Sequence, residues 1–118
     1  MKPEAVIFPK VVVLGRIENM PSEIREVDPR LLRVPASRRS GADPVKLRRQ
    51  IARFGASSVG MPPLIVYEGE DGVLVIYNGV TRATRIAMLA PGTLVRVEVI
   101  GRLRRAYESE SLIGDLLS

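Results

Sequence analysis

Two short, almost entirely apolar runs constrain the fold of this chain more than any other feature of its sequence. Residues 64–67 and 73–77 flank a polar segment that contains Asp71-Gly72. Runs of this kind on either side of such a turn predict a β-hairpin. Because both strands are apolar at nearly every position, we expect other parts of the chain to cover both faces of their sheet.

A helix is predicted on each side of this hairpin. In the first helix, Asp43 supplies an acidic N-cap, Pro44 occupies the first helical position, and Gly55 ends the helix. The apolar stripe of this helix consists of Leu47, Ile51 and Phe54. The second helix is expected over residues 80–90, where a Pro-Gly pair stops it.

Shorter signals complete the expected order of elements. Alternating valines predict a strand over residues 95–99 that Gly101 ends. A last helix is expected over residues 103–117, and its apolar side holds Leu112, Ile113, Leu116 and Leu117. We further expect strands at 11–14 and 24–27, loops at 18–23 and 35–43, and a loose start at 1–10. Residues 1–118 are therefore predicted to form a single α+β domain with a small mixed sheet and helices.

The chain contains neither cysteine nor histidine, and this excludes several kinds of site. Disulfides, thiolate metal sites, cysteine nucleophiles and histidine general bases are ruled out. Any catalysis must use carboxylates, hydroxyls, lysine or arginine, so the sequence leaves open whether the chain is an enzyme. Acidic residues gather near the hairpin turn, namely Glu68, Glu70 and Asp71. Turns favour such residues, and we expect no metal site there.

Basic residues outnumber acidic ones by 18 to 13, which gives a formal net charge of +5. Most of the basic residues are arginines, whose forked guanidinium groups match phosphate oxygens in pairs. This composition favours a nucleotide or a nucleic acid as the partner, although a solvated basic surface explains the charge equally well. No apolar run approaches the length of a membrane span and no secretory signal is visible, so we expect a cytoplasmic protein with no membrane partner.

The strand-to-helix turn at residues 77–82 (Tyr-Asn-Gly-Val-Thr-Arg) is the strongest functional signal. A helix N-terminus exposes amide groups that have no partner within the helix, and its dipole favours anions. Gly79 allows a sharp turn, Thr81 adds a hydroxyl, and Arg82 adds a guanidinium. The predicted phosphate site consists of Asn78, Gly79, Val80, Thr81 and Arg82, with Arg85 one helical turn further on. The simpler alternative is that Asn78 only caps the helix and Gly79 only relieves the turn.

Three segments in a fixed order resemble the ParB/sulfiredoxin-like superfamily over about residues 24–101. The first runs from Gln50-Ile51 to Gly55 and is similar to the family pattern S-I-x-x-x-G at the end of a helix. The second, residues 63–66 (Pro-Leu-Ile-Val), is similar to the P-hydrophobic-x-V strand. The third, residues 79–85 (Gly-Val-Thr-Arg-Ala-Thr-Arg), is similar to the G-E-R-R-x-x-A start of the next helix.

This resemblance implies a ParB/sulfiredoxin-like fold and a nucleotide-binding site. In the family the Gly-x-x-Arg turn binds nucleotide phosphates, those of CTP in chromosome-partitioning ParB proteins and those of ATP in sulfiredoxins. The implied cofactor is therefore CTP or ATP, with Mg²⁺. The resemblance further implies that Gly79, Thr81 and Arg82 contact phosphate. Gly60 and Pro63 would line the opposite side of the pocket.

The sequence also departs from the family pattern. Val80 stands where ParB proteins usually have glutamate, and the Cys-His pair of sulfiredoxins is missing, so sulfiredoxin chemistry is excluded. Residues 102–118 contain neither the E-N-x-x-R motif nor the helix-turn-helix domain that follow in ParB proteins. These departures leave CTP hydrolysis, centromere binding and clamp formation without support.

Two other functions remain open at the level of sequence. In the first, the chain is a DNA-binding or nuclease-like module whose arginines contact the phosphate backbone. The candidates are Arg38, Arg39, Arg48 and Arg49, which are also typical of a solvated surface. In the second, the fold survives as a non-catalytic protein-interaction module, and the apolar C-terminal helix joins two copies in a homodimer.

Overall fold

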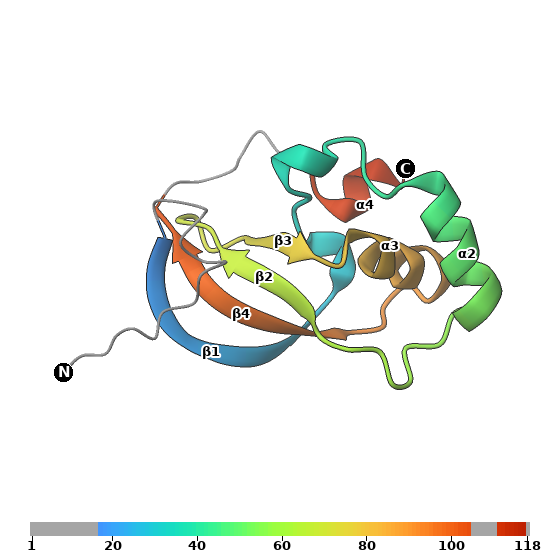
Figure 1. The fold of residues 1–118 in the computed structure, drawn as a ribbon, viewed down its shortest axis with the longest axis horizontal. Helices are drawn as coiled ribbons and strands as arrows, with labels where there is room; N and C mark the ends of the chain where they lie inside the picture. The colour runs from blue at the N-terminus through green and yellow to red at the C-terminus, as the bar shows by residue number, and fades with distance from the viewer. Residues whose placement is uncertain (1–16, 105–110, 118) are drawn as a thin grey trace.

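The structure of this chain is a computed structural model that describes residues 17–104 and 111–117 (Figure 1). The loose start predicted at residues 1–10 and the strand predicted at 11–14 lie outside the described residues. The described part contains a four-stranded sheet, three α-helices and two short 3-10 turns. The α+β class predicted from the sequence is confirmed.

The strands form a mixed sheet in the order β1-β4-β2-β3. Their bounds are Ile17–Val27 for β1, Val95–Leu103 for β4, Leu64–Glu68 for β2 and Leu74–Asn78 for β3. β1 and β3 run antiparallel to their neighbours, whereas the central strands β2 and β4 run parallel to each other. A parallel pair needs a crossover connection, and here β3 and the helix after it provide that connection.

An aliphatic core lies between the sheet and helix α3 (Val80–Leu89). On the helix, Ala83, Ile86 and Ala87 are at most 2% exposed. They pack against alternate strand residues, namely Leu64, Val66, Leu74, Ile76, Val95, Val97 and Val99. A slip of one residue in any strand would turn these side chains away from α3, so their burial fixes the register that places the end of β3 beside the start of α3.

The opposite face of the sheet carries a smaller cluster of Tyr67, Val75 and Leu103. The ring of Tyr67 meets the ring of Tyr77 edge-on, with centroids 5.5 Å apart. The hydroxyl of Tyr67 is buried without a hydrogen-bond partner among the described residues, and burial raises its pKa to about 12. Both faces of the hairpin strands are therefore covered where these residues lie, as the apolar runs predict.

The outer edge of β3 is covered by the chain that precedes the first helix. The amide of Arg33 donates to the carbonyl of Leu74, and the carbonyl of Arg33 accepts from the amide of Ile76, both at 2.9 Å. On the other side of this segment, the amide of Val34 donates to the carbonyl of Ser111 at 2.9 Å. These bonds satisfy backbone groups that an open sheet edge would leave unpaired.

Helix α2 (Pro44–Phe54) begins and ends where the sequence predicts. The side chain of Asp43 accepts hydrogen bonds from two amides of the first turn, and Gly55 ends the helix with a φ of +57°. The helix buries none of its residues completely, and Phe54 is 48% exposed. The reason is that α2 packs mainly against α3, at the edge of the molecule farthest from the β2–β3 turn (Figure 1).

Two expectations about the strands are wrong. Residues 18–23 do not form a loop but lie inside β1, where the register against β4 shifts between Asn19 and Glu23. Such a shift tolerates Pro21, which has no amide hydrogen for the ladder. Gly101 does not end β4 either, because β4 continues beyond it and stays paired with β1.

The prediction of a helix over residues 103–117 is also wrong about its length. Helix α4 has four residues, Ile113–Leu116, while residues 105–110 lie outside the described residues. Ile113 is 1% exposed, and its amide donates to the carbonyl of Leu32 at 2.8 Å. Because the chain enters α4 by pairing with the segment beside β3, Ile113 is anchored in the core, whereas Leu116 is 37% exposed. In the described residues α4 is therefore a single short turn rather than the long apolar helix that was expected to join two copies.

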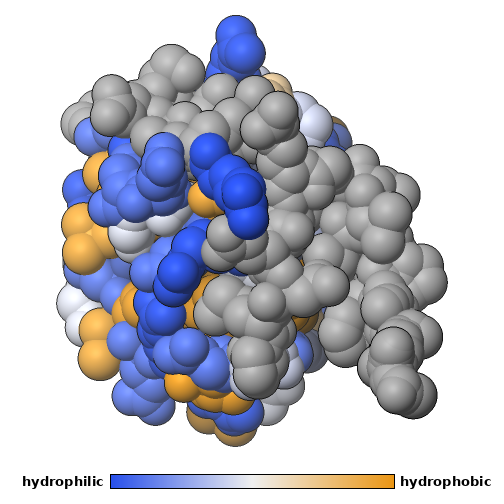
Figure 2. Space-filling view, turned by 90° about the vertical axis from the view of Figure 1, so that its left-hand side faces the viewer, coloured by the Kyte–Doolittle hydropathy of each residue, from blue (hydrophilic) through white to orange (hydrophobic). Residues whose placement is uncertain are grey.

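Figure 2 views the end of the molecule that carries the β2–β3 turn, which we call the turn end. Hydrophilic residues (blue) are interspersed there with hydrophobic ones (orange). No helix in the described ranges combines the length and the apolar character that a membrane span requires.

Candidate anion-binding site

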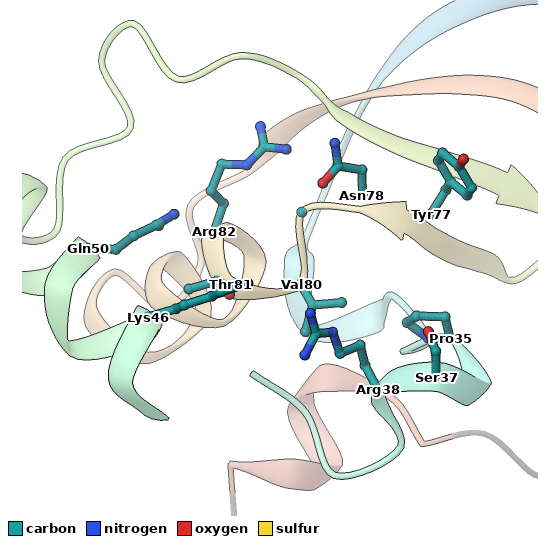
Figure 3. Close-up of a pocket in the computed structure, with 11 residues that line it drawn as sticks. Pro35, Ser37, Arg38, Lys46, Gln50, Tyr77, Asn78, Val80, Thr81 and Arg82 are labelled. Atoms are coloured by element: carbon teal, nitrogen blue, oxygen red, sulfur yellow. The ribbon is translucent and has the colours of Figure 1, made fainter. Parts of the chain in front are cut away.

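A cavity of about 360 Å³ opens where β3 ends and α3 begins (Figure 3). The predicted turn supplies one wall through Asn78, Gly79, Val80, Thr81 and Arg82, joined by Tyr77. Residues from earlier in the chain supply the other walls, namely Pro35, Ser37, Arg38, Lys46 and Gln50. The five turn residues predicted from the sequence are thus brought together in one cavity, with Arg38 beside them.

Gly79 is required at this turn for two separate reasons. Its φ is +123°, a conformation that residues with a side chain rarely adopt. A Cβ at this position would lie 2.6 Å from Cδ2 of Leu64 and 3.1 Å from Nη2 of Arg82. The absence of a side chain therefore allows the strand, the helix and the Arg82 guanidinium to meet at one point.

The start of α3 has no side-chain cap. Gly79 is the N-cap residue and no side chain of the described residues accepts a hydrogen bond from the first turn, so Asn78 does not cap this helix. Asn78 is instead the last residue of β3, with an exposed side chain. The first amides of α3 lack acceptors within the helix, and they open onto the cavity with the positive end of the helix dipole.

Arg82 is half-buried and is held at the rim by the loop before β2. Its Nη1 donates to the carbonyl of Pro62 at 2.9 Å and to that of Pro63 at 3.4 Å. For Nη2, no partner is found within the described residues. Burial lowers the pKa of the Arg82 guanidinium, because removing water disfavours the charged form. The guanidinium nevertheless stays protonated in proteins, so an anion beside it would replace the lost hydration.

Two more cations reach the cavity from distant parts of the chain. Arg38 ends the 3-10 turn Ala36–Arg38, and Lys46 lies in the first turn of α2. Figure 3 shows Arg38 and Arg82 on opposite sides of the start of α3, with Lys46 pointing toward Thr81. Sequence reasoning missed Lys46. Its spacing of four residues from Gln50 indicates a shared helix face, but only the packing of α2 on α3 directs that face to the cavity.

Among the described residues, the lining of this cavity contains three cations and no carboxylate, although the charges of Lys46 and Arg38 help to lower the pKa of Asp43 nearby. Val80, at the position where the resembling family has glutamate, is 8% exposed and belongs to the core cluster. Val80 is the first residue of α3, so its amide belongs to the first turn of the helix, while its side chain packs in the core. The cavity therefore offers a one-sided positive field made of guanidinium, ammonium and backbone amide groups, which favours a polyanionic ligand.

Arg85 is not part of this cavity, although it lies only one helical turn beyond Arg82. It is 2% exposed, and its Nη1 donates to the carbonyls of Gly55 at 2.7 Å and Ser57 at 2.8 Å. Its Nε donates to Oε1 of Gln50 at 3.3 Å. Arg85 therefore holds the loop after α2 against α3, and its donors are used for structure.

The remaining predicted residues lie around the cavity rather than in it. Pro63 supports Arg82 through its carbonyl, and Gly60 lines a separate, mostly apolar cleft of about 130 Å³ next to Met61 and Pro62. Arg39, Arg48 and Arg49 have exposed side chains on the loop before α2 and on α2 itself.

The acidic residues of the hairpin turn lie away from this cavity, and two of them, Glu68 and Asp71, have cationic partners. Asp71 accepts from Nη1 of Arg33 at 2.7 Å, and Glu68 pairs with Arg25 at 3.3 Å and with Arg102 at 3.6 Å. Across the described residues, no group of three or more acidic side chains is placed to hold a metal ion. These carboxylates neutralise arginines of the sheet.

Comparisons of the sequence with protein-family models and with curated proteins found no match. No protein-family model matches the chain, and none of the curated proteins matches it significantly. The cavity, its three cations and the uncapped start of α3 are therefore the observations from which a function can be proposed.

Proposed function

We propose that this chain is a phosphate-binding domain of the ParB/sulfiredoxin-like type, whose cavity at the start of α3 takes the phosphate groups of a nucleotide. One observation carries the proposal. Arg38, Lys46 and Arg82 come from three different elements and converge on the N-terminus of α3, where the described residues supply neither a carboxylate to the lining nor a side-chain cap to the helix.

The order of the elements supports the family part of this proposal. Helix α2 is followed by the glycine-containing loop, the hairpin β2–β3, the Gly-x-x-Arg turn, helix α3 and strand β4. This is the order in which the three resembling segments occur. The Gly-x-x-Arg turn lies at the junction of a buried strand and a helix, where backbone amides bind phosphate well.

The cavity has the size and the walls that a nucleotide needs. Its volume of about 360 Å³ falls within the range of small-molecule sites, about 300–1,000 Å³. Arg38 and Arg82, on opposite sides of the helix start, are placed to contact different phosphates of one chain. Tyr77 is 39% exposed at the cavity, where a flat ring can support a sugar or a base.

The lining favours binding rather than hydrolysis. The hydroxyl of Thr81 and the amides of α3 are placed to stabilise negative charge on phosphate oxygens, but the described lining offers no carboxylate that would accept a proton from attacking water. A nucleotide would arrive with its own Mg²⁺, and the protein's cations would contact the phosphate oxygens that the metal leaves open.

Isothermal titration calorimetry with CTP, ATP, ADP and inorganic phosphate tests the proposal. In Arg82→Ala, loss of a charge-assisted hydrogen bond should weaken nucleotide binding at least tenfold. Lys46→Gln should weaken it about threefold, since an exposed ammonium contributes less. The matched control is Arg96→Ala, which removes an exposed arginine of β4 away from the cavity. Wild-type protein that binds none of these ligands, or variants that bind like the control, would contradict the proposal. Thermal melting of each variant separates loss of binding from loss of folding.

A further inference from the structure

The net charge of this chain is concentrated in one segment. Residues 36–54 hold one acidic residue, Asp43, and six basic ones, so this segment alone accounts for the formal net charge of +5. The six basic residues are Arg38, Arg39, Lys46, Arg48, Arg49 and Arg53. Outside the segment, acidic and basic residues balance. A positive field therefore surrounds α2 and the loop before it rather than the whole molecule.

Three of these cations form a line along α2. Lys46, Arg49 and Arg53 are spaced three and four residues apart, so they lie along one side of the helix over about 10 Å. All three are exposed. The line begins at the cavity, because Lys46 lines it, and ends at Phe54, where the Arg53 guanidinium lies 5.3 Å from the ring centroid. We call these three residues the basic row.

No salt bridge joins the basic row to a carboxylate of the described residues, although the charge of Lys46 contributes to the lowered pKa of Asp43, just before α2. In the described part of the chain, none of its members forms an ion pair, whereas Arg25, Arg33 and Arg102 of the sheet region all do. α2 contains no acidic residue, so like charges face one another along the helix. The fold gains no stability from this arrangement, and an external polyanion would relieve the repulsion.

We propose that the basic row binds the phosphodiester backbone of a nucleic acid. A strand carries one phosphate about every 3.4 Å of its axis, so the length of the row matches about three phosphates. Arginine forks pair with phosphate oxygens in two-point contacts. Contacts with phosphates carry no information about the bases, so the binding is independent of sequence.

Other polyanionic partners fit this face less well. A helix that binds a membrane surface inserts its apolar side into the lipid, but the apolar stripe of α2 packs toward α3. A stable protein interface needs an apolar or aromatic centre, whereas the basic row is charged along its length and meets the half-exposed ring of Phe54 at its end. A nucleic acid requires no more than regularly spaced cations.

This binding goes beyond the nucleotide cavity and is separable from it. Arg49 and Arg53 do not line the cavity, so their replacement leaves its cations in place. The double variant Arg49→Gln/Arg53→Gln therefore tests the basic row, whereas Arg82→Ala tests the cavity.

Fluorescence anisotropy with a labelled 20-base-pair DNA duplex and with one of its single strands, at several salt concentrations, measures the binding. For Arg49→Gln/Arg53→Gln we expect affinity to fall about tenfold per lost contact near 50 mM salt, and the salt slope to decrease by about 2. Nucleotide affinity in calorimetry should stay within about twofold of wild type. The control Arg96→Gln/Arg102→Gln removes the same charge from β4 and should lose less than about threefold in DNA affinity.

Each outcome decides the proposal. Binding of the duplex, the single strand or both, with the expected loss in the row variant, supports it and identifies the form that binds. Equal losses in the row variant and in the control would show a general charge effect and overturn it. The proposal also fails if wild-type protein binds neither DNA, or if poly-glutamate or phosphatidylserine vesicles bind as tightly as DNA through the same two arginines. Failure of nucleotide binding alone leaves this result unaffected.

Discussion

The two ends of this molecule differ in whether their arginines form ion pairs with carboxylates. At the turn end, Arg33 pairs with Asp71 at 2.7 Å, and Arg25 and Arg102 share Glu68. At the other end, which we call the helical end, α2, the 3-10 turn before it and the start of α3 carry cations that form no salt bridge with the described residues, and only Asp43 interacts electrostatically with two of them, Arg38 and Lys46. Ion pairs neutralise charge inside the fold, whereas unpaired cations leave a field outside it. This difference agrees with our proposal that the helical end binds an external anion, whereas the charges of the turn end are used within the fold.

Arg82 and Arg85 show the same contrast within one helical turn. Both arginines are in α3, and burial lowers the pKa of both guanidinium groups. In Arg85, Nη1 donates hydrogen bonds to two loop carbonyls and Nε donates to Gln50. Its Nη2 donates to the sulfur of Met61 at 3.6 Å. Among the described residues, Arg82 donates to carbonyls through Nη1 alone, and its side chain lines the cavity. The number of donors already satisfied, rather than residue type, therefore distinguishes Arg85 from Arg82, the arginine that we propose binds phosphate.

The largest expected effect is on stability, and it comes from replacing each of these two arginines in turn by methionine. Arg85→Met should lower the free energy of unfolding by about 3 kcal/mol, because two short bonds from a charged donor are lost and the loop carbonyls are left unsatisfied. Arg82→Met should cost about 1 kcal/mol of stability, since its bonds lie at a partly exposed rim. Urea unfolding of both variants measures the difference. Equal losses of stability would remove the distinction between the two arginines.

A second prediction compares one glycine from each end. Gly79→Ala and Gly72→Ala both place a side chain at positive φ, which costs about 1–2 kcal/mol each. Only Gly79 has neighbours, at 2.6 Å and 3.1 Å from the added Cβ, whereas nothing lies within 4 Å at Gly72. We expect Gly79→Ala to be the more destabilising by at least about 1 kcal/mol and to weaken anion binding, because Nη2 of Arg82 must move. Similar costs at both sites, with anion binding intact, would contradict this account of the turn.

The smallest expected effect is a pH dependence that belongs to the turn end alone. The hydrogen bond from Arg33 is the main cause that lowers the pKa of Asp71, and the amide of Val73 adds to it. A lowered pKa in the folded state gives a stabilisation that is complete above the unfolded value, about 3.9, and is lost as the pH falls through the folded value.

Asp71→Asn should therefore be less stable than wild type at pH 7, and the difference should shrink as the pH falls below about 4. The control at the helical end is Arg49→Gln, whose difference from wild type should stay constant over the same range because Arg49 has no carboxylate partner in the described structure. Urea titrations at pH 7, 5 and 3 provide the measurement. A difference for Asp71→Asn that does not change with pH would show that the ion pair does not stabilise the turn end.

Sequence reasoning succeeded where the signal is local. The N-cap Asp43, the end of α2 at Gly55 and the start of α3 after Gly79 lie where they were predicted. Each of these depends on hydrogen bonds or backbone angles within a few residues, which the neighbouring residue types largely determine. The hairpin was predictable for the same reason.

Sequence reasoning failed where distant segments decide. β1 extends through Pro21 because β4 supplies a partner on which the strand can bulge. The C-terminal helix is reduced to one turn because Ile113 is anchored beside Leu32. Lys46 was missed because its role depends on how α2 lies against α3. In each case the partner is far away in the chain, and no local pattern records it.

The sequence by itself determined the order of the elements, the need for a glycine at the strand-to-helix turn and the excess of arginine. The tertiary structure decided which arginines have hydrogen-bond acceptors for their guanidinium groups. The residues next to Arg82 and Arg85 in the sequence do not tell the two arginines apart. Their partners differ because folding places the loop at 62–63 beside Arg82 and the loop at 55–57 beside Arg85. The physical reason is that helix caps and turns depend on adjacent residues, whereas satisfaction of a guanidinium depends on acceptors that folding brings from elsewhere.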